Sequence, residues 1–66
     1  MVKLRIKELR EENGMTQMQL ALRLDLNHRT ISHYEKGVSQ PDIQTIEKLC
    51  EIFQVTADYL LGLKDY

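Results

Sequence analysis

The sequence predicts an all-α fold, a compact bundle of five short helices, on three observations. Apolar residues recur every three or four positions through most of the chain, as expected of helices that bury one face. Thr16, Asn27, Asp42 and Thr56 each stand directly before such a segment, and all four are residue types that cap helix N-termini. The three glycines each fall just past a predicted helix.

The first helix is predicted over residues 4–13, where Ile6 and Leu9 share one face and Gly14 follows the end. The alternation of apolar residues at its start also fits a strand. The continuation, rich in Glu, Lys and Arg, favours a helix instead.

The second helix is predicted within residues 15–24 and has the fuller start signal. Thr16 precedes Gln19 by three residues, which is the spacing of a capping box. Met15 and Leu20 stand at the two positions of a hydrophobic staple. The residues predicted to face inward are Leu20, Ala21 and Leu24.

The third helix, residues 28–36, repeats this pattern with Asn27 as its cap, while Gly37 follows its end. Leu26 and Ile31 form its hydrophobic staple. The link from the second helix is about three residues long, which predicts a sharp turn between the two. The outward face of the third helix is polar and consists of His28, Arg29, Ser32, His33 and Lys36.

Two further helices complete the chain. One is predicted over residues 43–53 behind the cap Asp42, and a final turn and a half over residues 57–61 behind Thr56. The apolar repeat of the longer one comprises Ile43, Ile46, Leu49, Cys50 and Phe53.

Size and composition exclude several classes of protein. A chain of 66 residues forms one domain, residues 1–66, with a small core. One cysteine allows no internal disulfide, and no Cys/His cluster has the spacing of a metal site. No stretch has the length of a membrane span, and the start has no signal-peptide apolar region. We expect a cytoplasmic protein without a metal or other cofactor.

Charge is unevenly distributed along the chain. The net charge is −1, which argues mildly against a polyanionic partner. Residues 1–37, however, hold seven Lys/Arg against five Asp/Glu, whereas residues 38–66 hold two against five. The first half therefore permits a nucleic-acid surface without requiring one.

The stretch "TQMQLALRLDLNHRTISHYEKG", residues 16–37, resembles the helix-turn-helix of the phage-repressor-like (Cro/CI, Xre-type) family. Similarity extends outward through "IKELREENGMTQ" and "PDIQTIEKLCEIFQVTADYLLG", so that it covers roughly residues 4–62. The sequence departs from the family pattern at Asp25, where glycine is usual, and in the loop 37–42, which has no lysine or arginine. The resemblance implies a lambda-repressor-like DNA-binding domain.

In such a motif the third helix enters the major groove of double-stranded DNA. The resemblance therefore implies a base-contacting set of His28, Arg29, Ser32 and His33. It implies phosphate contacts at Gln17, Thr16, Asn27, Thr30, Lys36 and Ser39. Gln17 has the added attraction of a helix N-terminus, and Arg29 has the fork geometry that binds guanine.

Two further expectations follow from the resemblance. Arg10 and Glu35 hold the positions of a salt bridge between the first and third helices, which we expect to act as a structural brace. Relatives usually act as dimers on two half-sites of a palindromic operator. The expected self-contacts lie in the last helix and the tail, at Tyr59, Leu60, Leu61 and Leu63.

The function expected from the sequence is a sequence-specific transcription regulator, of the repressor kind, of bacterial or phage type. The alternative is a helical protein-interaction module on the same scaffold, which the acidic total and the loop without lysine or arginine favour. An enzyme is not expected, because the histidines lack a nucleophile, a pocket and an orienting partner. No small-molecule ligand is evident.

Overall fold

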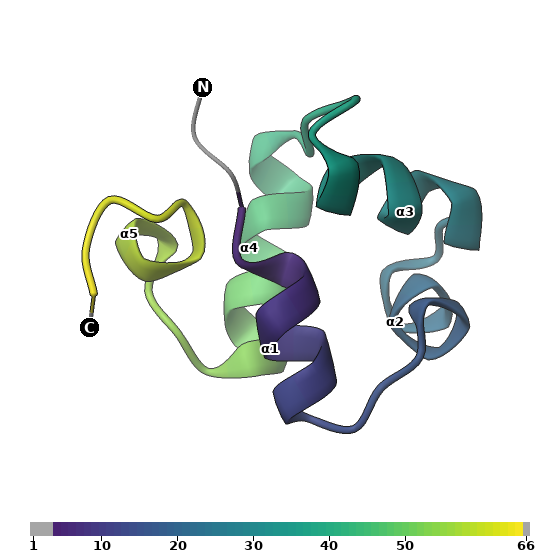
Figure 1. Ribbon diagram of the computed structural model, residues 1–66, viewed down its shortest axis with the longest axis horizontal. Coiled ribbons are helices and arrows are strands. Elements are labelled where there is room, and N and C mark those ends of the chain that lie inside the picture. The colour runs from purple at the N-terminus through teal and green to yellow at the C-terminus, as the bar shows by residue number, and fades with distance from the viewer. Residues whose placement is uncertain (1–3, 66) are drawn as a thin grey trace.

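Five α-helices follow one another through residues 4–65, the part of the chain that the computed structural model describes (Figure 1). No strand occurs among these residues, so the predicted all-α class is confirmed. In Figure 1, α1 crosses in front of α4, with α2 and α3 on one side of this pair and α5 on the other. The helices are α1 (Ile6–Glu12), α2 (Gln17–Leu24), α3 (His28–Lys36), α4 (Ile43–Phe53) and α5 (Ala57–Leu60).

Helices α2 to α5 begin after the caps that the sequence predicts. The side chains of Thr16, Asn27, Asp42 and Thr56 each accept a hydrogen bond from a backbone N–H of the first turn, over 2.8–3.2 Å. At α2 the capping box is complete, because the Gln19 side chain accepts in return from the N–H of Thr16 at 2.8 Å. These local hydrogen bonds fix where each helix starts.

Helix α1 starts two residues later than predicted, at Ile6 and not at residue 4. The backbone N–H of Arg5 donates to the carbonyl oxygen of Leu60 at 3.0 Å, which ties the entry of α1 to α5. Leu4, ahead of this bond, is buried outside any helix. A tertiary contact thus overrides the local helix signal at this end.

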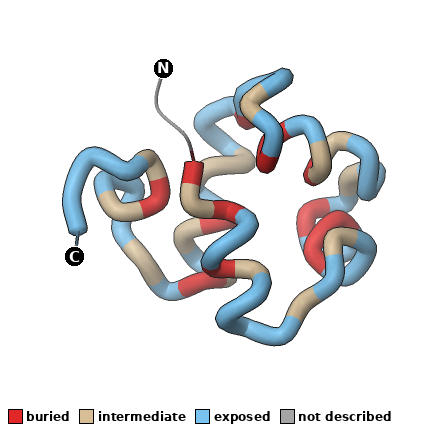
Figure 2. Tube along the Cα trace, in the orientation of Figure 1, coloured by how far each residue is buried: buried red, intermediate tan, exposed pale blue. Residues whose placement is uncertain are grey.

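The core lies between the helices, and each of the five helices has buried residues (Figure 2). It contains the predicted inward residues of the first three helices, together with residues of α4 and α5. The buried hydrophobic side chains are Leu4, Ile6, Leu9, Leu20, Ala21, Leu24, Ile31, Tyr34, Leu49, Phe53 and Leu60.

Two sequence predictions about apolar residues are wrong. Ile43 was expected in the buried repeat of α4 but is 75% exposed, because it is the first residue of the helix and lies beyond the edge of the core. Leu60 was expected at a dimer contact but is completely buried within the protein. It belongs to the core cluster, so it has no surface to offer a second copy.

The turn between α2 and α3 requires a left-handed backbone at Asp25, with φ 58° and ψ 41°. A side chain in this conformation costs roughly 1–2 kcal/mol, and less for Asp than for most residues. The next residue, Leu26, donates its N–H to the carbonyl oxygen of Ala21 at 2.8 Å, which closes the end of α2. The short link therefore sets the direction in which α3 leaves.

Asp25→Gly should leave the free energy of unfolding unchanged or raise it by up to about 1 kcal/mol, because glycine adopts this conformation without strain. Glu47→Gly, at an exposed position inside α4, is the control and should cost about 1 kcal/mol. Urea denaturation measures both. An Asp25→Gly variant that loses as much stability as the control would contradict the prediction.

Candidate nucleic-acid interface

Helix α3 presents a polar face to solvent, on the side away from the core. Ile31 and Tyr34 anchor it to the body, with exposed fractions of 0% and 8%. Of the predicted base-contacting residues, His28, Arg29 and His33 are exposed, whereas Ser32 is half-buried. The structure thus leaves three of these four side chains accessible along the outer face of one short helix.

Burial of the anchor affects its chemistry as well as its position. Desolvation raises the pKa of the Tyr34 phenol above its ordinary value, and the carboxylate of Asp42 adds to the effect.

The predicted pair of Arg10 and Glu35 is present as a salt bridge between α1 and α3. Arg10 Nε donates to Glu35 Oε2 at 2.7 Å, and Arg10 Nη2 donates to Oε1 at 3.3 Å. The two side chains are only 11% and 6% exposed, so this is not a solvated surface pair. The hydrogen bond to Glu35 raises the pKa of Arg10 above its ordinary value, although burial opposes it.

A third helix joins this pair through Gln17, the first residue of α2. Its side-chain Nε2 donates to Glu35 Oε1 at 3.0 Å. Arg10 also reaches the connection before α2, because its Nη1 donates to the carbonyl oxygen of Met15 at 2.8 Å. The family resemblance implied the pair of Arg10 and Glu35 but not Gln17 as a third member, and no local spacing in the sequence links residues of three helices.

The bond to Glu35 orients Gln17 without using all of its hydrogen-bonding groups. An amide side chain has two N–H donors and one carbonyl acceptor. One donor is engaged by Glu35, so the second donor and the carbonyl oxygen stay available for a ligand.

The other predicted phosphate-contacting residues lie around the ends of α2 and α3. Thr16 and Asn27 are exposed, and their side-chain oxygens serve as helix caps. Asn27 keeps its NH₂ group for a ligand. Lys36 and Ser39 are exposed near the end of α3, whereas Thr30 is half-buried.

A polar hollow of about 320 Å³ opens where α1, α2 and α3 meet. It is lined by Lys7, Arg10, Gln17, Ser32, Glu35 and Lys36. Sequence reasoning singled out five of these side chains but missed Lys7. The available signal was its spacing, because Lys7 precedes Arg10 by three residues and so lies on the same face of α1.

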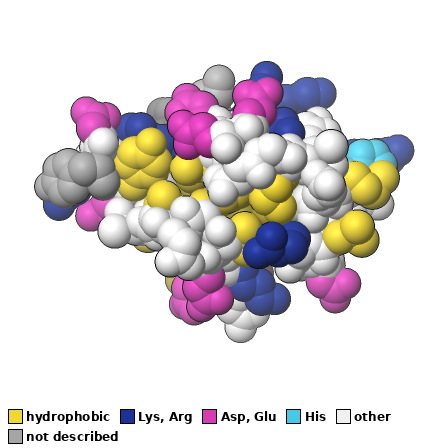
Figure 3. Space-filling view, turned by 90° about the horizontal axis from the view of Figure 1, so that it is seen from below, with side chains coloured by type: hydrophobic (Ala, Val, Ile, Leu, Met, Phe, Trp, Pro, Cys, Tyr) yellow, Lys and Arg dark blue, Asp and Glu magenta, His cyan; other side chains and the backbone are white. Residues whose placement is uncertain are grey.

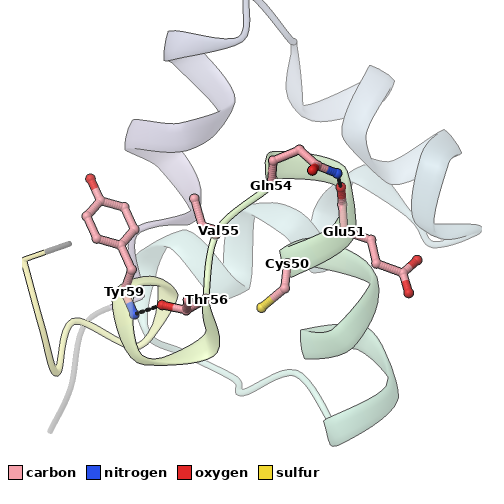
Figure 4. Close-up of a pocket in the computed structure, with 6 residues that line it drawn as sticks. All are labelled: Cys50, Glu51, Gln54, Val55, Thr56 and Tyr59. Carbon is pink, nitrogen blue, oxygen red and sulfur yellow. Dashed lines mark hydrogen bonds between the residues drawn. The ribbon is translucent and has the colours of Figure 1, made fainter.

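A second hollow, of about 580 Å³, lies between the end of α4 and α5 and not beside α3 (Figure 4). Two hydrogen bonds join residues that line it. The N–H of Tyr59 donates to the side-chain oxygen of Thr56, and the side chain of Gln54 donates to the carbonyl oxygen of Glu51. The first bond caps the start of α5, and the second lies at the end of α4. Cys50 also lines this hollow, and burial raises the pKa of its thiol, an effect to which the charge of Glu47 adds.

Apolar side chains gather near the middle of the face shown in Figure 3, between side chains of both charges.

Among residues 4–65, no three His, Cys, Asp or Glu side chains come together as metal ligands. Within the same range, none of the helices has the length and apolar character needed to span a membrane.

Comparison with known families matches residues 6–60 to the helix-turn-helix model. The chain belongs to the helix-turn-helix family, in its phage-repressor-like (Cro/CI, Xre) branch. The match covers all five helices, including the α2–α3 motif that carries the polar face.

Individual members of the helix-turn-helix family resemble the chain closely. The HTH-type transcriptional regulator ImmR of Bacillus subtilis is 40% identical over 58 residues, which cover 88% of this chain and 46% of ImmR. The solved structure of a transcriptional regulator from Listeria innocua has a TM-score of 0.84 and 31% identity, covering 88% of this chain and 54% of that one.

The structure of the P22 c2 repressor, solved in complex with a synthetic operator, has a TM-score of 0.83 and 25% identity, with 91% of both chains covered. These matches confirm the lambda-repressor-like fold. The chain spans about half the length of the first curated relatives that it matches.

Removing one partner of the Arg10–Glu35 pair should destabilise the fold strongly, because the other charge stays nearly buried. Glu35→Gln should lower the free energy of unfolding by about 2–3 kcal/mol and Arg10→Met by about 3 kcal/mol. The double variant should lose less than the sum of the two. Urea denaturation of all four proteins measures the coupling, and strict additivity would contradict the prediction.

Proposed function

We propose that this chain is a sequence-specific double-stranded DNA-binding domain of a transcription regulator, which inserts α3 into the major groove. The observation that carries the proposal is the exposed polar face of α3, held out from the core by Ile31 and Tyr34. Membership of the helix-turn-helix family supports it, as do relatives named as transcriptional regulators and the operator complex of the P22 c2 repressor.

Base contacts in this proposal come from His28, Arg29, Ser32 and His33. Arg29 offers two parallel N–H donors to the O6 and N7 of a guanine, a pairing worth roughly 1–3 kcal/mol of discrimination. Each histidine supplies a hydrogen-bond donor or acceptor, and a charge when protonated. Ser32 contributes a short hydroxyl from the inner edge of the face.

Phosphate contacts come from the residues around this face. Gln17 stands at the N-terminus of α2, where a backbone N–H and the remaining amide donor both suit an anion. The other proposed contacts are Thr16, Asn27, Thr30, Lys36 and Ser39. Arg10 and Glu35 act as the brace that keeps Gln17 in register with α3.

A homodimer on a palindromic operator completes the proposal, with repression by operator occupancy in a bacterial or phage-infected cytoplasm. A single half-site gives few contacts, and two half-sites about 34 Å apart place one α3 in each of two successive grooves. Leu63, with 61% of its side chain exposed, and the half-buried Tyr59 and Leu61 offer apolar surface beside α5 for the self-contact.

A protein-interaction module is the second candidate, and one observation favours it. The loop 37–42 carries no lysine or arginine, while Val38 and Ile43 expose apolar side chains at its two ends, with 68% and 75% accessible. Exposed apolar side chains beside a loop without cationic residues suit a protein partner better than a phosphate backbone.

Salt dependence separates the two candidates. Binding to a duplex of random sequence should weaken as salt rises, by about 0.9 log units in affinity per log unit of salt for each phosphate neutralised. Fluorescence anisotropy of a labelled duplex measures the affinity at salt concentrations from roughly 50 to 300 mM. The slope of log affinity against log salt follows from these values. A flat response would leave the protein-interaction module as the better explanation.

Arg29 and Gln17 should differ in how their loss affects a selected operator and its single-base variants. Arg29→Ala should cost about 1–3 kcal/mol on the operator and abolish discrimination at one base pair. Gln17→Ala should weaken binding to all duplexes by a similar factor, because a phosphate is present whatever the sequence. A uniform loss for Arg29→Ala would exclude a base contact for this residue.

A further inference from the structure

We infer that the hollow between α1, α2 and α3 receives one phosphate of the DNA backbone, and that Lys7 of α1 is one of its ligands. This inference rests on the proposed function and extends the DNA-contacting surface to a helix outside the helix-turn-helix motif. It identifies the ligand of this hollow as a phosphodiester, held by lysine charge and amide donors.

The charge balance of the hollow favours an anion. Its lining has three cationic side chains, from Lys7, Arg10 and Lys36, and one carboxylate, from Glu35. Both oxygens of Glu35 already accept hydrogen bonds, from Arg10 and from Gln17. The carboxylate is therefore neutralised by Arg10, and the two lysines give the hollow its excess positive charge.

Neither lysine is engaged elsewhere in the part of the chain that is described. Within residues 4–65, the ion pairs are those of Arg5 with Asp65, Arg10 with Glu35, and Lys64 with Asp58. Lys7 and Lys36 are both exposed, so their ammonium groups can turn toward a ligand on long flexible stems. Lysine binds phosphate as a compact point charge, which needs no fixed fork geometry.

The position of the hollow favours a backbone phosphate over a base edge. Ser32 and Lys36 are four residues apart and lie on one ridge of α3, on the side that faces α1 and α2. Arg29 and His33 form a parallel ridge and do not line the hollow. When the second ridge faces the bases, Lys36 faces the strand that borders the groove, on the same side as Gln17.

The test compares Lys7→Gln with Lys48→Gln, a matched control in which the same charge is removed from an exposed position on α4 that lines neither of the two hollows described above. Both variants are first checked for native helicity by circular dichroism. Affinity for a random duplex is then measured against salt. Lys7→Gln should reduce the slope of log affinity against log salt by about 0.9. The factor by which the variant binds DNA more weakly than wild type should therefore shrink roughly eightfold over a tenfold rise in salt.

A second measurement identifies the phosphate. In a duplex selected for binding, single phosphates are replaced by neutral methylphosphonates, one position at a time. Wild type and Lys48→Gln should share one sensitive position at which Lys7→Gln loses clearly less affinity than they do, because Lys36 and Gln17 still contact that phosphate. Lys7→Arg should restore the sensitivity, because it restores the charge.

These measurements test the role of Lys7 separately from DNA binding itself. If wild type binds DNA with a steep salt slope while Lys7→Gln and Lys48→Gln behave alike, the role of Lys7 is excluded and the DNA-binding proposal stands. If wild type shows no salt-dependent binding to any duplex, both are overturned.

Discussion

The carboxylate of Glu35 is the constraint on which the arrangement of the first three helices depends. A buried carboxylate costs several kcal/mol unless it is paired and hydrogen-bonded, and here Arg10 and Gln17 supply three donors from two other helices. A helix of nine residues is marginal on its own in water. Helix α3 is therefore stable only where Ile31, Tyr34 and Glu35 find their partners, and that position leaves its polar face outward.

Features that arise within a few residues of chain could be predicted from the sequence. The bounds of α3 and α4 were predicted correctly, because a side-chain cap determines where each begins. The start of α1 was not, because it depends on a hydrogen bond from Arg5 to Leu60, near the other end of the chain. The same limit explains Ile43, whose helical face was predicted correctly but which lies beyond the edge of the core.

In the candidate site, too, the sequence could predict local features but not those that depend on how the helices pack. Helical periodicity alone indicates which side chains of α3 point outward, so the exposure of Arg29 and His33 was predictable. The bond from Gln17 to Glu35 and the placement of Lys7 beside Lys36 depend on how three helices pack, which no spacing in the sequence encodes. Leu60 shows the converse, since in a helix of four residues the pattern could not separate the buried leucine from its neighbours.

The lysines and arginines are concentrated in the first part of the sequence. Seven of the nine lysines and arginines lie in residues 1–37, the part of the sequence that contains α1, α2 and α3. Arg5 is turned away from this group, because it stacks over the ring of Tyr59 and pairs with Asp65. A chain with a net charge of −1 gains little from long-range attraction to a polyanion. In the proposed function, affinity for DNA therefore comes from short-range contacts, so correct placement of Lys7, Gln17 and Arg29 matters more than the total charge.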